Sequence, residues 1–125
     1  MILKDDPNRW KVCDKVIETV NELDVKFIYL QFTDIHGIIK SFEINSKRLE
    51  DFLQDGENFD GSSITGYGAI EESDKVALPD PSTFQILPWR SGEKKVARFI
   101  CDIFKPDGDR YEGDPRYILQ KVVKK

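Results

Sequence analysis

The start of the chain carries apolar side chains at the spacing of one helix face. Between Trp10 and Leu23 they recur every three or four positions, which predicts an amphipathic helix packed on a core. Pro7 or Asn8 could open this helix. The apolar positions are Val12, Val16, Ile17, Val20 and Leu23.

The next segment changes to a strand pattern. Residues 25–33 are mostly aromatic and aliphatic, which is typical of a strand. Residues 34–37 read as a turn and residues 38–44 as the returning strand, so the pattern predicts a β-hairpin. His36 is the one histidine of the chain, and its place beside Gly37 favours a turn residue over a catalytic group.

A short helix and a long loop are predicted next. Asn45 or Ser46 can cap a helix that runs to Leu53 and ends at Asp55-Gly56. Residues 56–68 contain four glycines and show little periodicity, so we expect a long loop there.

The second half contains shorter patterns. Pro79 and Pro81 argue against a central strand or helix at that point. Residues 84–89 predict a short strand, residues 95–103 a second strong strand, and residues 106–109 a turn.

A last helix begins at Asp114-Pro115, because Asp is a good N-cap and Pro fits the first helical position. Its apolar face is formed by Ile118, Leu119, Val122 and Val123. The chain stops after barely three turns of this helix, so we expect it to be a fragment of a larger protein. The order of elements predicts an α+β domain with a small mixed sheet and flanking helices.

Composition narrows the class of protein. The chain has 125 residues, 39% of them hydrophobic and 34% charged, which is the balance of one ordinary soluble domain, or one domain plus a short extension. A net charge of −4 argues against nucleic-acid binding. Cys13 and Cys101 lack metal-site spacing and are expected to be reduced thiols. The sequence contains no apolar segment long enough to predict a signal peptide or a membrane span, so a cytoplasmic location is expected.

The most promising chemistry lies at residues 59–64, Phe-Asp-Gly-Ser-Ser-Ile. Asp60 could hold a small cation or an amine and draw a proton from an ammonium, while Gly61 would let the backbone approach a ligand. Ser62 and Ser63 could add hydrogen bonds. An ordinary turn rich in Asp and Ser is the alternative, and the residues alone favour it. The acidic residues 71–74 could likewise bind a metal, but a solvated or ion-paired segment is favoured.

These motifs, taken in order, resemble the N-terminal signature of glutamine synthetase. Residues 59–63 are followed after eight residues by Glu72-Ser73-Asp74, and residues 29–37 are similar to that family's first hairpin. Residues 78–84 and Pro88-Trp89 are similar to the stretch after the loop. Residues 97–103 and 112–116 look like the passage into the catalytic domain. The resemblance implies a β-grasp-like domain over residues 1–104, and a linker and first catalytic-domain helix over residues 105–125.

The resemblance also implies an activity. Members of the class I, bacterial and archaeal type make glutamine from glutamate and ammonia with ATP and Mg²⁺ or Mn²⁺. They form dodecamers of two hexameric rings whose active sites are shared between neighbouring subunits. Asp60 would bind and deprotonate ammonium, Ser63 would support the loop, and Tyr67 would lie at the lip of the nucleotide site, whereas Asp74 would order the interface. The metal ligands would lie beyond Lys125, so this chain alone is expected to be inactive.

Two other functions remain open. A relative that joins another amine to glutamate would share these motifs, because most of the amine pocket lies elsewhere. A stand-alone regulatory or binding module that docks on a synthetase would share them too. The reading frame after Lys125 separates the enzyme from the module.

Overall fold

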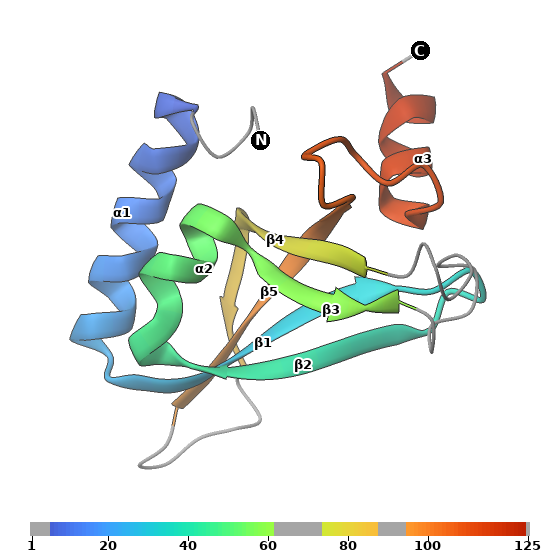
Figure 1. Cartoon of the computed structure of the whole chain (residues 1–125). Helices are drawn as coiled ribbons and strands as arrows, with labels where there is room; N and C mark the ends of the chain where they lie inside the picture. The colour runs from blue at the N-terminus through green and yellow to red at the C-terminus, as the bar shows by residue number, and fades with distance from the viewer. Residues whose placement is uncertain (1–5, 62–73, 88–94, 125) are drawn as a thin grey trace.

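The computed structural model describes residues 6–61, 74–87 and 95–124, and within them the chain forms one mixed sheet of five strands. The strand order is β2-β1-β5-β4-β3, with β1 and β5 parallel and the other neighbours antiparallel. Helices α1 and α2 lie side by side on one face of the sheet, while α3 stands apart from them near the end of β5 (Figure 1). The elements are α1 (Pro7–Glu22), β1 (Val25–Thr33), β2 (Ile39–Asn45), the 3₁₀ turn η2 (Ser46–Arg48), α2 (Leu49–Asp55), β3 (Glu57–Asp60), β4 (Asp74–Ile86), β5 (Lys95–Phe104) and α3 (Pro115–Val123).

The first helix and the hairpin are confirmed. Asp6 caps α1 by accepting a hydrogen bond from the amide of Asn8, and Pro7 occupies the first turn. Strands β1 and β2 pair antiparallel with Phe27 opposite Asn45 and Thr33 opposite Ile39. Alternate side chains of β1 therefore point at the helices, and these form the centre of the core with the inward faces of α1, α2 and β5.

The predicted long loop after Gly56 is wrong at its beginning. Residues Glu57–Asp60 form β3, which pairs antiparallel with the start of β4. Residues 62–68 of that predicted loop lie outside the described residues. A strand of four residues carries almost no periodic signal of its own, so its neighbour in the sheet defines it.

The exclusion of a central strand around the prolines is also wrong. β4 runs through Pro79 and Pro81 and lies between β5 and β3. However, β3 pairs only with residues 74–77 of β4. Farther along the same edge of β4, the carbonyl of Pro79 accepts a hydrogen bond from Arg9 at 2.8 Å. A strand residue directs its N–H and C=O to the same edge, so Pro79 forfeits no ladder hydrogen bond. Pro81 falls where the register with β5 shifts, between Asp80 and Gln85.

The last strand and the last helix are confirmed. β5 lies at the centre of the sheet between β1 and β4, and Asp114 caps α3 by accepting from the amide of Arg116. Both cysteines, Cys13 and Cys101, are buried free thiols, and burial raises the pKa of each.

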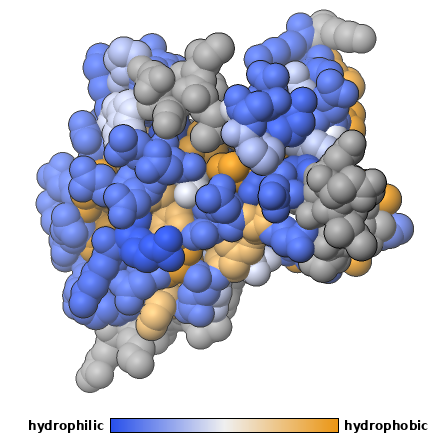
Figure 2. Space-filling model, viewed as in Figure 1, coloured by the Kyte–Doolittle hydropathy of each residue, from blue (hydrophilic) through white to orange (hydrophobic). Residues whose placement is uncertain are grey.

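Two groups of apolar side chains remain exposed among the described residues. One is the outer face of α3, which has no buried residue, and the other lies at the turn between β1 and β2. Figure 2 shows a largely hydrophilic face on which apolar groups lie in the middle and also at the right-hand edge, the side on which Figure 1 places α3 and the hairpin turn. No described helix combines the length and apolar character needed to cross a membrane. The exposed side chains are Ile35, Ile38 and Ile39 at the turn, and Ile118, Leu119, Val122 and Val123 on α3.

Candidate functional site

Asp60, the predicted cation-binding residue, ends strand β3. It is exposed and stands directly opposite Asp74 in the antiparallel pair. Directly opposed residues project from the same face of a sheet with Cβ atoms roughly 4.5–5.5 Å apart, and like charges so placed destabilise the pair. The arrangement therefore favours a cation or a hydrogen-bond donor close to these carboxylates. Ser62, Ser63 and Tyr67, the other predicted site residues, lie outside the described residues.

Phe59 fixes the position of Asp60. Its ring centroid lies 5.0 Å from that of Phe32 on β1 and 5.5 Å from that of Phe42 on β2. Strand β3 is at one edge of the sheet and β2 is at the other, so these contacts show that the sheet curls until its two edges meet. Because side chains alternate along a strand, the inward direction of Phe59 turns Asp60 outward.

Gly56 lets β3 approach β4 closely. It ends α2 with φ = 74°, a backbone conformation that residues other than glycine rarely adopt. A Cβ atom here would lie 2.7 Å from the carbonyl oxygen of Ala77 and 2.8 Å from Cγ1 of Val76. The glycine predicted only as a helix end is therefore also required for the strand that carries Asp60.

A hollow of about 410 Å³ lies beside Asp60. It is lined by Asn58, Phe59, Asp74, Lys75 and Pro106. Lys75 is 4% exposed, and its Nζ lies 4.7 Å from the centre of the Tyr111 ring. A cation over the face of an aromatic ring is stabilised electrostatically, so the hollow combines a carboxylate with a buried, ring-stacked ammonium.

Sequence reasoning missed part of this site. It assigned no role to Asn58 or Lys75, and it connected Asp74 with an interface instead of with Asp60. The polar–apolar–polar order of residues 58–60 was the available signal for a strand, but it is too short to fix a register. Within the described residues no three His, Cys, Asp or Glu side chains gather in a way that could hold a metal ion. His36 lies in the hairpin turn, as predicted.

A second polar cluster joins α3 to the sheet. Arg116 donates to Asp102 on β5 at 2.6 Å and to Asp80 on β4 at 2.8 Å. Burial raises the pKa of Asp80, but the hydrogen bonds from Arg116 and a neighbouring serine outweigh it and hold that pKa below its ordinary value. Burial keeps the pKa of Asp114 raised, against the hydrogen bonds it accepts from the amides of Ile103 and Arg116. Because guanidinium and carboxylates pair with each other here, this cluster fastens α3 to β4 and β5.

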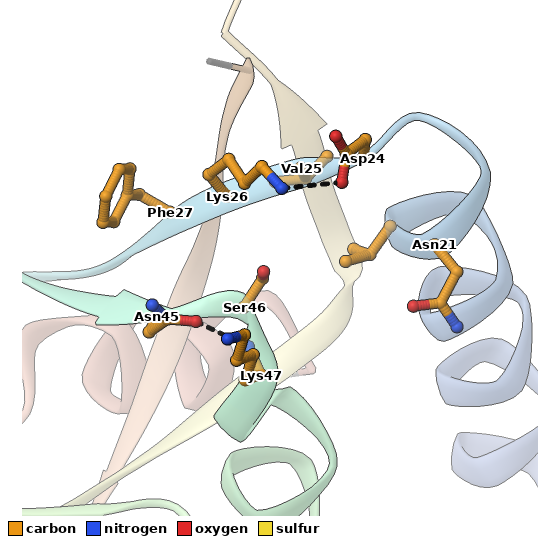
Figure 3. A pocket seen from close by; sticks show the side chains of 9 residues that line it. Asn21, Asp24, Val25, Lys26, Phe27, Asn45, Ser46 and Lys47 are labelled. Carbon is orange, nitrogen blue, oxygen red and sulfur yellow. Dashed lines mark hydrogen bonds and ion pairs between the residues drawn. The ribbon is translucent and has the colours of Figure 1, made fainter. Parts of the chain in front are cut away.

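A further cavity, of about 420 Å³, lies at the opposite end of the sheet, where β1 begins and β2 ends (Figure 3). Figure 3 shows Lys26 turned toward Asp24. Nζ of Lys26 lies 3.0 Å from Oδ1 of Asp24, and both side chains of this ion pair are exposed. Asn45 accepts a hydrogen bond from the amide of Lys47 at 2.9 Å. These polar groups are paired locally, and the cavity is remote from Asp60.

Comparison with known proteins agrees with this architecture. The family model described as "Glutamine synthetase, beta-Grasp domain" matches residues 24–106. Two proteins named glutamine synthetase are similar to this chain: one from Methanosarcina mazei, 52% identical over 111 residues and 89% of the chain, and one from Clostridium saccharobutylicum, 51% identical over 109 residues and 87% of the chain. The chain spans 25% of the length of each of these relatives.

Solved structures share the fold. A cryoEM structure of Plasmodium falciparum glutamine synthetase matches with a TM-score of 0.79 and 26% identity, over 90% of this chain and 22% of that one. A structure described as "GmaS/ADP complex-Conformation 1" matches with a TM-score of 0.77 and 23% identity, over 86% of this chain and 24% of that one, which supports the fold alone. The extent of the family match, together with identities above one half to named relatives, shows that this chain belongs to the glutamine synthetase beta-Grasp domain family.

Proposed function

We propose that this chain is the N-terminal part of an ATP-dependent glutamate–ammonia ligase that makes glutamine, and that Asp60 serves its ammonium site. Family membership supports the reaction, since relatives about half identical to the chain are named glutamine synthetase. The chain spans a quarter of their length, so we assign the complete reaction to the longer protein and expect residues 1–125 alone to be inactive.

The placement of Asp60 carries the proposal. Its carboxylate ends an edge strand, projects away from the core, and faces the Asp74 carboxylate across the strand pair. A carboxylate near an ammonium ion favours the charged form of both, so the ion is attracted and oriented. When the ammonium gives a proton to such a carboxylate, the ammonia that remains is a nucleophile.

Other residues of the chain have supporting roles in this proposal. Ser63 holds the loop that follows Asp60, and Tyr67 lies at the lip of the nucleotide site. ATP with Mg²⁺ or Mn²⁺, when bound, would supply the phosphoryl group that activates the glutamate carboxylate as an acyl phosphate, with ADP as the leaving group. We assign the ligands of those ions to the longer protein, of which this chain spans a quarter.

We further propose the assembly and its setting. The protein is a cytoplasmic homo-oligomer, a dodecamer of two hexameric rings, in which Asp60 acts in the active site of the neighbouring subunit. Residues 1–104 form the β-grasp-like domain, and residues 105–125 form the linker and the first helix of the catalytic domain. The family match over residues 24–106 supports this boundary.

Replacement of Asp60 in the full-length protein tests the ammonium site. Asp60→Asn removes the charge and the proton acceptor while keeping the size of the side chain. A lost hydrogen bond to a charged group costs about 1.5–3 kcal/mol, so the KM for ammonium should rise at least about tenfold. The KM values for glutamate and ATP should remain unchanged.

Asp51→Asn is the matched control, because Asp51 is an exposed carboxylate in the first turn of α2. It should leave all three KM values unchanged. An Asp60→Asn enzyme with the ammonium dependence of the unaltered protein would remove Asp60 from the ammonium site.

A further inference from the structure

Lys75 is a buried cation next to the carboxylates of the candidate site. It is 4% exposed, and the strand register places it opposite Phe59, while the preceding residue, Asp74, stands opposite Asp60. Consecutive strand residues project from opposite faces of a sheet, yet Asp74 and Lys75 both line the hollow beside Asp60, where strand β3 ends and strand β4 begins. A positive charge therefore lies behind two opposed carboxylates.

Tyr111 holds this positive charge in place. Nζ of Lys75 lies 4.7 Å from the centre of the Tyr111 ring. The Tyr111 amide donates a hydrogen bond to the carbonyl of Ile103 at 3.0 Å, and its ring lies against Gly113, where an added Cβ would be 2.6 Å from the ring carbon Cζ. A cation over an aromatic face is stabilised electrostatically, so the ammonium group stays in the hollow. Because it is buried, dissolved salt screens its field less than the field of an exposed lysine.

The charges of these three side chains influence which cation the site accepts. Asp60 and Asp74 present two negative charges directly opposite each other across the strand pair. Carboxylate oxygens are ligands that Mg²⁺ prefers, so such a pair attracts divalent ions as well as ammonium. Adding Lys75 leaves this group of three with a single net negative charge, which one monovalent cation balances.

We propose that Lys75 is a specificity-determining residue that keeps divalent metal ions out of the ammonium site. This inference rests on the proposed function, because a reaction that uses ATP with Mg²⁺ or Mn²⁺ exposes the site to those ions. The Coulomb energy between Lys75 and a bound ion is proportional to the charge of that ion, so the repulsion is twice as large for a divalent ion as for ammonium. Doubling the energy squares the effect on the affinity.

The size of the effect follows from distance and dielectric. Since Lys75 and Asp74 leave β4 on opposite faces, the Lys75 charge lies on the order of 10 Å from a cation held by the two carboxylates. In a medium between a protein surface and bulk water, two unit charges at that distance change an affinity by about threefold. For a divalent ion the change is the square of this, about tenfold.

Steady-state kinetics of the full-length protein test the proposal. Lys75→Met keeps the length of the side chain and removes its charge. It should lower the KM for ammonium by about threefold, and it should lower by about tenfold the inhibition constant of Mg²⁺, added in excess over ATP, as a competitor of ammonium. Lys75→Arg keeps the charge and the contact with the aromatic ring, so it should leave both constants unchanged. Lys47→Met is the matched control, because Lys47 is an exposed lysine at the cavity remote from Asp60, and it should also leave both constants unchanged.

The direction of the change separates a charge effect from structural damage. Circular dichroism and Tm establish that each variant is folded, and Lys75→Gln replaces Lys75→Met if the latter does not fold. A folded Lys75→Met enzyme with an unchanged or raised KM for ammonium would overturn the proposal, because loss of a repelling charge lowers that KM and damage to the strand pair raises it. Equal changes for ammonium and Mg²⁺, or a Lys75→Arg enzyme that behaves like Lys75→Met, would overturn it too. If neither uncharged variant folds, Lys75 serves the fold and the proposal fails.

Asp60→Asn, measured in parallel, separates this inference from the proposed function. It should raise the KM for ammonium. If it does so while Lys75→Met leaves both constants unchanged, the ammonium site stands and the role of Lys75 is wrong. If Asp60→Asn uses ammonium normally, the proposed function fails, and the role of Lys75 fails with it.

Discussion

The contact of Phe59 with the far side of the sheet should support both stability and the position of Asp60. Phe59→Ala removes ring contacts to Phe32 and Phe42 at centroid distances of 5.0 and 5.5 Å. A fully buried Phe→Ala change costs about 3–5 kcal/mol, and Phe59 is only partly buried, so we expect a loss of about 2 kcal/mol. For a chain of this size that loss lowers Tm by about 8 °C.

The two consequences are measured separately. Urea titration of the 125-residue chain gives the change in free energy of unfolding, and steady-state kinetics of the full-length protein give the KM for ammonium. Phe27→Ala is the control, because Phe27 is also half-buried but lies at the cavity remote from Asp60. Both variants should lose stability, and only Phe59→Ala should raise the KM for ammonium.

Two results would refute this reasoning. A Phe59→Ala chain as stable as the unaltered one would mean that the aromatic contact does not hold β3 in place. A destabilised but folded Phe59→Ala enzyme with the original KM for ammonium would mean that Asp60 does not depend on β3 for its position.

Two further changes test the backbone and the ion pairs. Gly56→Ala should lower the free energy of unfolding by about 3 kcal/mol, because the new side chain meets both a positive φ and a collision with β4. Gly37→Ala, at φ = 79° with no atom within 4 Å of the added Cβ, should lower it by about 1 kcal/mol. Equal losses in urea titrations would contradict the close approach of β3 to β4. Asp80, with its pKa held below 3.8, stabilises the fold above about pH 4, and this contribution disappears as the pH falls through the lower folded-state value. Asp80→Asn should therefore flatten the acid decline of the urea midpoint, and an unchanged decline would show that the pair with Arg116 adds no stability.

The sequence predictions were accurate where an element depends on interactions within its own segment, and wrong where it depends on contacts with distant segments. Helix α1 and strands β1 and β5 are long and periodic, and their predicted positions are confirmed within a few residues. The caps were predictable because Asp114-Pro115 and Asp55-Gly56 act on their own backbone. The sequence did not predict strand β3 or the path of β4 through Pro79, because both depend on which edge of a strand has a neighbouring strand.

The candidate site divides in the same way. Residues 59–64 made Asp60 a candidate for cation chemistry while favouring an ordinary turn, and the resemblance led to the correct family. The opposition of Asp60 and Asp74 and the hollow containing Lys75 became evident only when β3 was paired with β4. The roles of Asp60, Ser63 and Tyr67 stay predictions.

The sequence by itself determined the long periodic elements of this protein, namely helix α1 and strands β1 and β5. Hydrophobic periodicity and capping act over a few residues, so a single segment contains enough information to specify them. The tertiary structure decided the central place of β5, parallel to β1, and the curl that brings Phe59 onto Phe32. These choices depend on contacts between residues far apart along the chain, whose burial must offset the entropy of closing long loops, and no single segment encodes that balance.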